Sequence, residues 1–189
     1  MIFFALPVFS ALPEGGEDLD SYIAALASGD QSALEQIYRQ THGAVYGFAL
    51  SLCKNAQDAE DVLQEVYIQA YQGAGSYASQ GKPMAWLLTI TRNLALMCLR
   101  EKKRVVAMSP EDWQIQFADR AAFTEEDRLL LEGLLSRLGD EERQIVMLHA
   151  VAGLKHREIA QLLELPLATV LSKYSRSLKK LRNLFMEVQ

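Results

Sequence analysis

The chain has 189 residues, half of them apolar, and a formal net charge of -5. This length suits one domain or two small ones, and the apolar share is enough for sizeable cores. The negative sum argues against a protein that binds polyanions over its whole surface. The charge is uneven, however: residues 155–182 hold seven bases against two acids, so a local basic face can contact phosphates.

Residues 1–17 are expected to form an N-terminal extension that is mostly apolar. The run MIFFALPVFSALP has no basic n-region and is interrupted by Pro7, so neither a signal peptide nor a membrane span is expected. A disordered extension, a segment that docks on the body and an artefact of start-site choice are three open interpretations. We expect a cytoplasmic protein without direct membrane insertion.

Apolar residues recur at spacings of three and four and strand patterns are nearly absent, so the sequence predicts an all-α fold. Asn55 is the expected N-cap of the third helix, Pro83 fits the first turn of the fourth, and Asp140 is the expected cap of the sixth. The expected helices are 19–27, 31–52, the segment from the Asn55 cap to 71, 83–104, 124–138, 140–151 and two more within 155–182.

Residues 105–123 lack a sustained apolar period and hold Ser109-Pro110 and several acids. They are the expected linker. The predicted organisation is therefore two small helical domains, 18–104 and 124–189, joined by a flexible acidic linker.

The two cysteines and three histidines form no metal or redox motif. Cys53 and Cys98 lie in apolar helical contexts, which favours buried thiols in a reducing cytoplasm over a disulfide. His42, His149 and His156 lack partners at metal-ligand spacing. The sequence therefore predicts no metal site and no cofactor.

One face of the third helix carries unmatched acids. Asp58, Asp61 and Glu65 fall at i, i+3 and i+7, and such acids repel each other by about a few tenths of a kcal/mol per pair. Two interpretations stay open: the face is merely solvated, or a basic partner matches it.

Aromatic and basic residues lie around a loop rich in glycine and serine, residues 73–83. Tyr77 lies within it and Trp86 lies just after it, and the next helix ends in a cluster of cations that includes Arg100 and Lys103. Aromatic rings beside bases suit single-stranded nucleic acid, where bases stack and phosphates are neutralised. Alternatively, Trp86 anchors the core, and the cations only complement the helix dipole.

The segment KHREIAQLLELPLATVLSKYSRSLKKLR, residues 155–182, reads as two short helices with a tight turn, the pattern of a helix-turn-helix. The expected inward face of its second helix is Val170, Tyr174, Leu178, Leu181 and Phe185. The other side offers candidates for base and phosphate contact: Thr169, Ser172, Lys173, Arg176 and Lys180. An ordinary helical hairpin with a solvated basic face is the alternative.

Three segments in this order and spacing carry a resemblance: DAEDVLQEVY (58–67), PMAWLLTITRN (83–93) and EIAQLLELPLATVLSKYSRSLKKLR (158–182). Together they closely resemble a bacterial RNA polymerase sigma factor of the extracytoplasmic-function (ECF) group, over about residues 20–104 and 125–185. The resemblance implies that the chain binds core RNA polymerase and directs promoter-specific transcription initiation. It also implies an anti-sigma factor that covers both domains.

The resemblance assigns roles to both domains. Residues 18–104 match sigma domain two, which docks on the polymerase through Asp58, Asp61, Gln64 and Glu65. The same domain would hold the melted downstream promoter element with Tyr77, Lys82, Trp86, Arg92, Asn93, Arg100 and Lys103. Residues 124–189 match sigma domain four, whose helix-turn-helix would read the upstream element as duplex, while the linker would thread the polymerase near the RNA exit path.

The chain departs from the family pattern at three positions. Leu171 and Lys173 stand where the family often has Lys and Arg, and Met97 stands where an acid is frequent. Lys lacks the planar fork of Arg, so the sequence preference is expected to differ or to be weaker.

Two other functions compete with a sigma factor. A helix-turn-helix transcription regulator would act without polymerase docking, typically as a symmetric dimer, but the chain lacks an evident dimer helix. An enzyme would need a nucleophile with its base, a phosphate-binding loop or a metal site, and none is recognisable. No small-molecule substrate is therefore expected.

Overall fold

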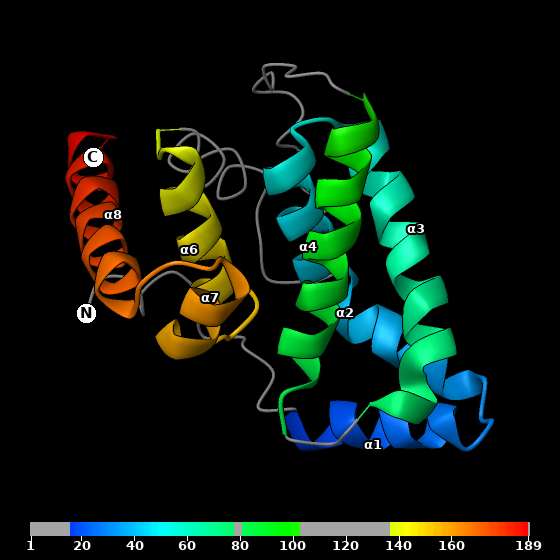
Figure 1. The fold of residues 1–189 in the computed structure, drawn as a ribbon. Helices are drawn as coiled ribbons and strands as arrows, with labels where there is room; N and C mark the ends of the chain where they lie inside the picture. The colour runs from blue at the N-terminus through cyan, green and yellow to red at the C-terminus, as the bar shows by residue number, and fades with distance from the viewer. Residues whose placement is uncertain (1–15, 78–80, 103–136, 189) are drawn as a thin grey trace. The chain divides into compact units, whose positions relative to one another are not determined.

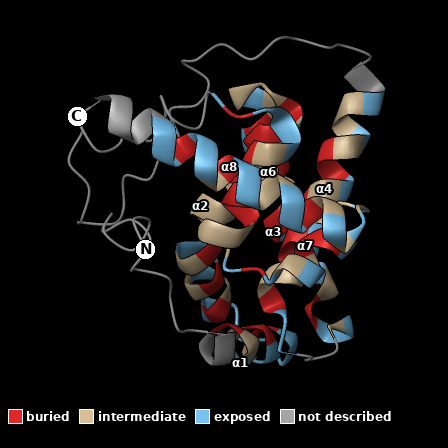
Figure 2. Cartoon of the chain, turned by 90° about the vertical axis from the view of Figure 1, so that its left-hand side faces the viewer, coloured by how far each residue is buried: buried red, intermediate tan, exposed pale blue. Residues whose placement is uncertain are grey.

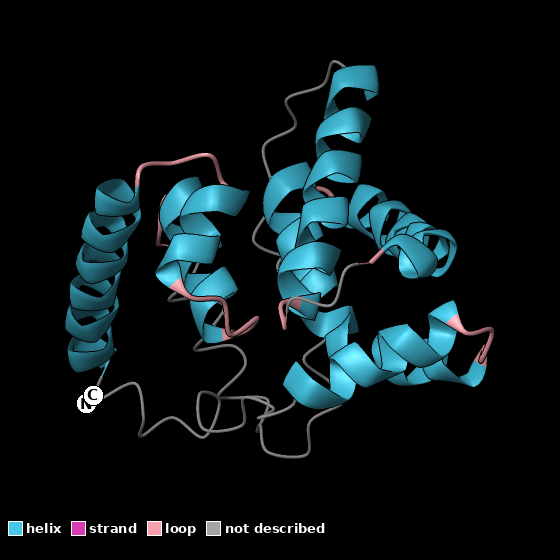
Figure 3. Ribbon diagram, turned by 60° about the horizontal axis from the view of Figure 1, so that its bottom comes forward, coloured by secondary structure: helices cyan, strands magenta, loops and turns pink. Residues whose placement is uncertain are grey.

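The computed structural model describes residues 16–77, 81–102 and 137–188, and every regular element among them is helical (Figures 1 and 3). The chain divides into two compact units. The structure thus confirms the predicted all-α fold with two helical domains. The predicted N-terminal extension (1–17), apart from its last two residues, the predicted linker and nearly all of the helix expected at 124–138 lie outside the described residues.

The first unit holds the helices α1 (Gly16–Ala27), α2 (Ser32–Cys53), α3 (Ala56–Gly73) and α4 (Pro83–Lys102), with a short 3-10 turn, η2 (Ala74–Ser76), after α3. The helices α2, α3 and α4 pack against one another, and α1 runs across one end of this bundle (Figure 1). The bundle leaves one side of α3 and one side of α4 open to solvent.

The core of this unit comes from apolar residues that recur every three or four positions along each helix. Phe48, Val66 and Leu87, one from each of α2, α3 and α4, are at most 1% exposed. A polar pair also crosses the core: the Tyr67 hydroxyl lies 2.8 Å from Thr41 Oγ1. Burial raises the pKa of Tyr67, so this hydroxyl stays protonated and the buried pair stays neutral.

Three helix starts are predicted from the sequence, at Asn55, Pro83 and Asp140, and the structure confirms the first two. The Asn55 side chain accepts a hydrogen bond from the Asp58 amide at 3.0 Å, as an N-cap does, and α4 begins at Pro83. The prediction for Asp140 is wrong by one residue. Gly139 is the cap and donates its amide to a Glu142 carboxylate at 3.2 Å, because that carboxylate reaches back over the first turn.

The second unit holds α6 (Asp140–Ala150), α7 (His156–Leu162) and α8 (Leu167–Val188). Both α6 and α7 pack against α8. The turn between α7 and α8 spans four residues, 163–166, so these two helices form the expected helix-turn-helix.

The inward face of α8 differs in part from the expected stripe. Val170 and Leu181 are buried, but Tyr174 and Leu178 are only half-buried, and Ser177 is fully buried with them. Figure 2 shows how buried and exposed residues alternate along α8. The Ser177 hydroxyl donates to the Lys173 carbonyl at 2.8 Å, which satisfies its polar group inside the helix. The last residue of the expected stripe is Phe185, and its side chain is outside the part of the chain that the structure describes.

No helix in the described ranges combines the length and the apolarity that crossing a membrane requires. In the same ranges, no three His, Cys, Asp or Glu side chains are placed to hold a metal ion.

Candidate nucleic-acid and partner interfaces

The four predicted docking residues lie together on the solvent side of α3. Asp61 and Gln64 are exposed, whereas Asp58 and Glu65 are half-buried beside them. The opposite side of the helix is buried in the core and consists of Ala59, Val62, Val66, Tyr67 and Ala70. The helical period explains this division.

Neutral side chains hold two of these carboxylates in place. Gln57 Nε2 donates to Asp61 Oδ1 at 3.3 Å, and Gln69 Nε2 donates to Glu65 Oε1 at 3.4 Å. Within the described residues neither Asp61 nor Glu65 forms an ion pair. The face therefore keeps its negative charge and can attract a basic partner.

The exposed side of α3 continues with two large side chains that the sequence reasoning missed. Ile68 is 50% exposed and Tyr71 is 46% exposed. They follow Gln64 at spacings of four and seven, so counting the helical period onward from Asp61 would have found them. We call the residues Asp61, Gln64, Ile68 and Tyr71 the α3 face. It combines charge at one end with apolar surface at the other.

Tyr77 and Trp86 form a ring pair at the loop between α3 and α4. Their centroids are 4.9 Å apart, and the Tyr77 hydroxyl donates to Asp20 Oδ1 at 2.7 Å. A Cβ added at Gly73 would lie 3.6 Å from the Trp86 ring, so the indole packs closely on the end of α3. Trp86 is half-buried, which fits an anchor that still leaves part of its ring open.

One face of α4 brings three predicted DNA contacts into line. Trp86, Asn93 and Arg100 are spaced by seven residues, and the latter two are exposed. Met97, 51% exposed, lies between them on the same face. The aromatic, amide and cationic groups of this face suit a nucleic-acid strand that lies along the helix.

The other predicted contacts in this domain are more scattered. Lys82 is exposed just before α4 begins, and Arg92 is half-buried on a neighbouring side of the helix. Lys103 lies outside the described residues.

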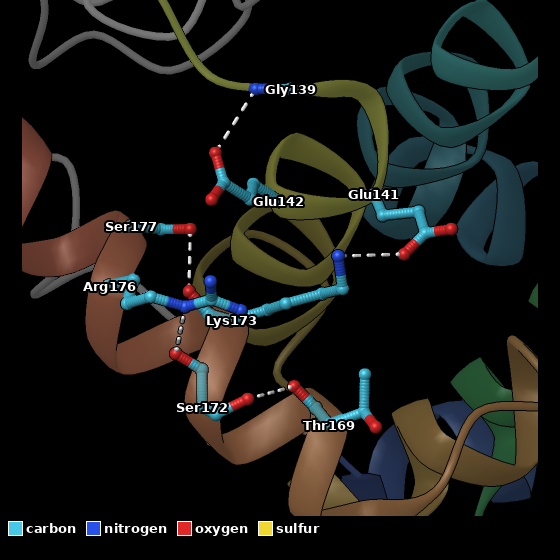
Figure 4. Close-up of polar contacts among 8 residues, drawn as sticks. All are labelled: Gly139, Glu141, Glu142, Thr169, Ser172, Lys173, Arg176 and Ser177. Carbon is cyan, nitrogen blue, oxygen red and sulfur yellow. Dashed lines mark hydrogen bonds and ion pairs between the residues drawn. The ribbon is translucent and has the colours of Figure 1, made fainter.

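Five residues form the outward face of α8 along its first turns. Going around the helix they are ordered Leu171, Ser175, Ala168, Ser172 and Arg176, and all five are exposed. Ser172 Oγ donates to the Thr169 carbonyl at 3.0 Å, and Arg176 Nε donates to the Ser172 carbonyl at 3.3 Å (Figure 4). Thr169 itself is half-buried at the edge of this face. Ala168 and Ser175 are not among the contacts predicted from the sequence, although the helical period counted from Ser172 includes both.

Two predicted contacts on α8 are tied to α6 instead. Lys173 extends toward α6, where its Nζ lies 3.0 Å from Glu141 Oε2, and its side chain is only 26% exposed (Figure 4). Lys180 Nζ lies 3.6 Å from Glu142 Oε2. The structure therefore separates these two lysines, which brace α8 against α6, from Ser172 and Arg176, which face outward.

Comparison with known protein families gives two matches. The model of sigma-70 region 2 matches residues 37–105, and that of sigma-70 region 4 matches residues 128–181. The ECF RNA polymerase sigma factor SigK of Mycobacterium ulcerans is 30% identical over 179 residues, which cover 90% of this chain and 95% of SigK. The chain belongs to the ECF group of sigma factors. SigK of Mycobacterium tuberculosis H37Rv is 29% identical over the same shares.

Two solved structures share the fold of this sigma factor. CnrH, solved in complex with the cytosolic domain of CnrY, superposes with a TM-score of 0.59 at 24% identity and covers 90% of the chain and 98% of CnrH. RpoE of Bartonella quintana, solved with the anti-sigma factor NepR, superposes with a TM-score of 0.62 at 24% identity and covers 80% and 96%.

Membership of the group settles the class of function. ECF sigma factors bind core RNA polymerase and direct promoter-specific transcription initiation, and this sigma factor has both regions that the family models describe. The predicted family and function are thereby confirmed.

Three rings join α6, α7 and α8 in this sigma factor. The centroid of His156 lies 4.3 Å from that of His149 and 4.7 Å from that of Tyr174. His149 Nδ1 lies 2.8 Å from the Leu154 carbonyl, whereas His156 Nε2 is buried without a hydrogen-bond partner among the described residues. Burial, and secondarily His149, lower the pKa of His156.

Proposed function

We propose that domain two of this sigma factor docks on core RNA polymerase through the α3 face, with Asp58 and Glu65 beside it. Two observations support this: the carboxylates of Asp61 and Glu65 are held by neutral amides rather than neutralised by cations, and large apolar side chains lie exposed next to them. A basic partner surface with an apolar patch would complement both parts.

We propose that the outer side of α4 holds the melted downstream element. Its candidate contacts are Tyr77, Lys82, Trp86, Arg92, Asn93, Arg100 and Lys103. The alignment of Trp86, Asn93 and Arg100 on one face supports this, because a base can stack on the ring while the amide and the guanidinium contact other parts of the strand.

We propose that the first turns of α8 enter the major groove of the upstream element. Ser172 and Arg176 are the best candidates for direct contact, with Thr169 at the edge, and their exposure on one side of α8 is the observation that supports this. Lys173 and Lys180 would contact phosphates only after leaving their partners on α6.

The location and the partners follow from this role. The protein would act in the cytoplasm, where its polymerase is, without catalysing a reaction of its own. RpoE of Bartonella quintana was solved with the anti-sigma factor NepR, which supports proposing an anti-sigma factor as a partner here.

The test compares DNA binding with and without the polymerase. Promoter duplexes are first selected in vitro with holoenzyme reconstituted from core RNA polymerase and the full chain. The chain alone is expected to bind the selected duplex weakly, and holoenzyme is expected to bind it and initiate at a defined site. Tight, specific binding by the chain alone, with no gain from core polymerase, would instead identify an independent regulator.

A further inference from the structure

The outward face of α8 has an apolar edge. Leu171 is 47% exposed, one of the largest exposed apolar side chains among the described residues. Its neighbours on the outward side of the helix, Ala168 and Ser175, are small and also exposed, so neither covers the isobutyl group there, whereas Leu167 and Tyr174 are half-buried on its other side. A single exposed leucine is ordinary on a protein surface. This one lies on the face that the proposed function presents to duplex DNA.

The arrangement around the helix divides this face into three parts. Leu171 is at one edge, Arg176 is at the other, and the small side chains of Ala168, Ser172 and Ser175 lie between them. Small side chains at the centre allow the helix backbone to approach the base edges closely. The Arg176 side chain runs along the helix toward the Ser172 carbonyl, so the guanidinium charge lies at the polar edge of the face (Figure 4).

The chemistry of Leu171 selects among the groups that the major groove displays. The isobutyl group neither donates nor accepts a hydrogen bond. Thymine alone presents a methyl group there, at C5, whereas the corresponding edges of the other bases carry mainly donors and acceptors. An apolar side chain against those polar groups would leave them without water or a partner, which is unfavourable.

We propose that Leu171 is a specificity-determining residue that contacts the C5-methyl group of a thymine in the upstream promoter element. This inference rests on the proposed function, because it requires α8 to lie in the major groove. Leu171 stands where the family often has a lysine, and this departure would give the protein a preference for thymine at the contacted position.

The test removes the methyl group and the side chain separately. Each thymine of the selected upstream element is replaced in turn by deoxyuridine, which lacks only the methyl, and holoenzyme affinity for each duplex is measured. For the wild-type chain we expect about a fourfold loss at one or two positions, the effect of losing one buried methyl-sized group. In holoenzyme with Leu171→Ala, the same replacement should change affinity by less than about twofold.

Arg176→Ala serves as the matched control. It should weaken binding of every duplex while keeping the sensitivity to deoxyuridine, because it removes the opposite edge of the face. A pull-down of core polymerase with Leu171→Ala should equal that of the wild type.

Three results would overturn the inference: no deoxyuridine-sensitive position, sensitivity that persists in Leu171→Ala, or loss of core-polymerase binding by Leu171→Ala, which would make this leucine part of a protein interface. Failure of the proposed function looks different. In that case wild-type holoenzyme would not distinguish the selected upstream duplex from any other.

Discussion

Glu164 adopts a left-handed backbone conformation, with a φ of 56°, between α7 and α8. The Leu165 amide donates to the Ala160 carbonyl at 3.0 Å and the Glu164 amide to the Gln161 carbonyl at 3.3 Å. These two bonds close the end of α7 and require the left-handed conformation of Glu164. Glycine is favoured there because any Cβ crowds the backbone, so the tight turn of the helix-turn-helix is formed at some cost in stability.

The cost at this position can be isolated by comparing two substitutions. Glu164→Gly and Glu164→Ala both remove the carboxylate, but only the alanine keeps a Cβ in the left-handed conformation. We expect the unit α6–α8 to be more stable with Gly than with Ala by about 1 kcal/mol. Urea unfolding of the full chain, followed by amide signals of α8, measures the difference. Equal stabilities of the two variants would contradict the expected strain.

Single residues show where the sequence was informative and where it was not. The Asn55 cap could be predicted because the bond that it makes is local, three residues along the chain. The burial of Ser177 could not, because an apolar pattern skips serine, and its hydroxyl is satisfied by a carbonyl of its own helix. The ion pair of Lys173 could not be predicted either, because its partner, Glu141, lies on another helix.

At the scale of elements, the ion pairs between α6 and α8 restrain two cations of the proposed DNA-reading helix. The pair of Lys173 and Glu141 is partly exposed, so it contributes at most about 1 kcal/mol to stability. Its larger effect is on charge, because a lysine held by a glutamate neutralises a phosphate less effectively.

Glu141→Gln is therefore expected to leave folding nearly unchanged and to release Lys173 toward DNA. We predict that holoenzyme with this variant binds the upstream duplex about two- to fivefold more tightly at low salt, with a salt dependence steeper by up to about 0.9 in log–log slope. Glu35→Gln is the matched control, since it breaks the 2.7 Å ion pair with Arg39 in the other domain. A salt dependence identical to that of the wild type would show that Lys173 stays away from the DNA.

The ring cluster of α6, α7 and α8 predicts a pH dependence. Because the pKa of His156 in the folded protein is lowered, the unfolded chain binds a proton more readily near its ordinary pKa of 6.5. The stability of these three helices should therefore fall as the pH drops through about 6.5. Tyr174 does not contribute, since burial raises its pKa further from this range.

His156→Phe keeps a ring in the cluster but removes the titrating group. We expect the thermal midpoint of α6–α8, followed by amide signals in the full chain, to fall less between pH 7.5 and 5.5 in this variant than in the wild type. His42→Phe, in the other domain, should retain the wild-type fall of that midpoint. An unchanged pH dependence in His156→Phe would exclude this histidine as the cause.

At the scale of the whole molecule, charge is concentrated on two helix faces, one in each domain. The exposed acids lie on α3 and the basic residues lie on α8. Each domain as a whole is nearly neutral, with nine acids and eight bases in residues 18–104 and ten of each in residues 124–189, so net charge alone does not reveal either face. The two-domain organisation could be predicted because each helix has its own apolar period. The extent of the α3 face could not, because Ile68 and Tyr71 look like core residues until their exposure is known.

The central claim is that the α3 face and the acids beside it bind core RNA polymerase, and charge reversal tests it most directly. The double variant Asp61→Lys and Glu65→Lys is expected to keep the wild-type helical content, because Asp61 is exposed and Glu65 is only half-buried. Glu35→Lys on α2 is the control, with a carboxylate that is 61% exposed in the same domain. In a pull-down with core polymerase, the double variant should lose binding while Glu35→Lys and the wild type are retained. Retention of the folded double variant at the wild-type level would contradict the claim.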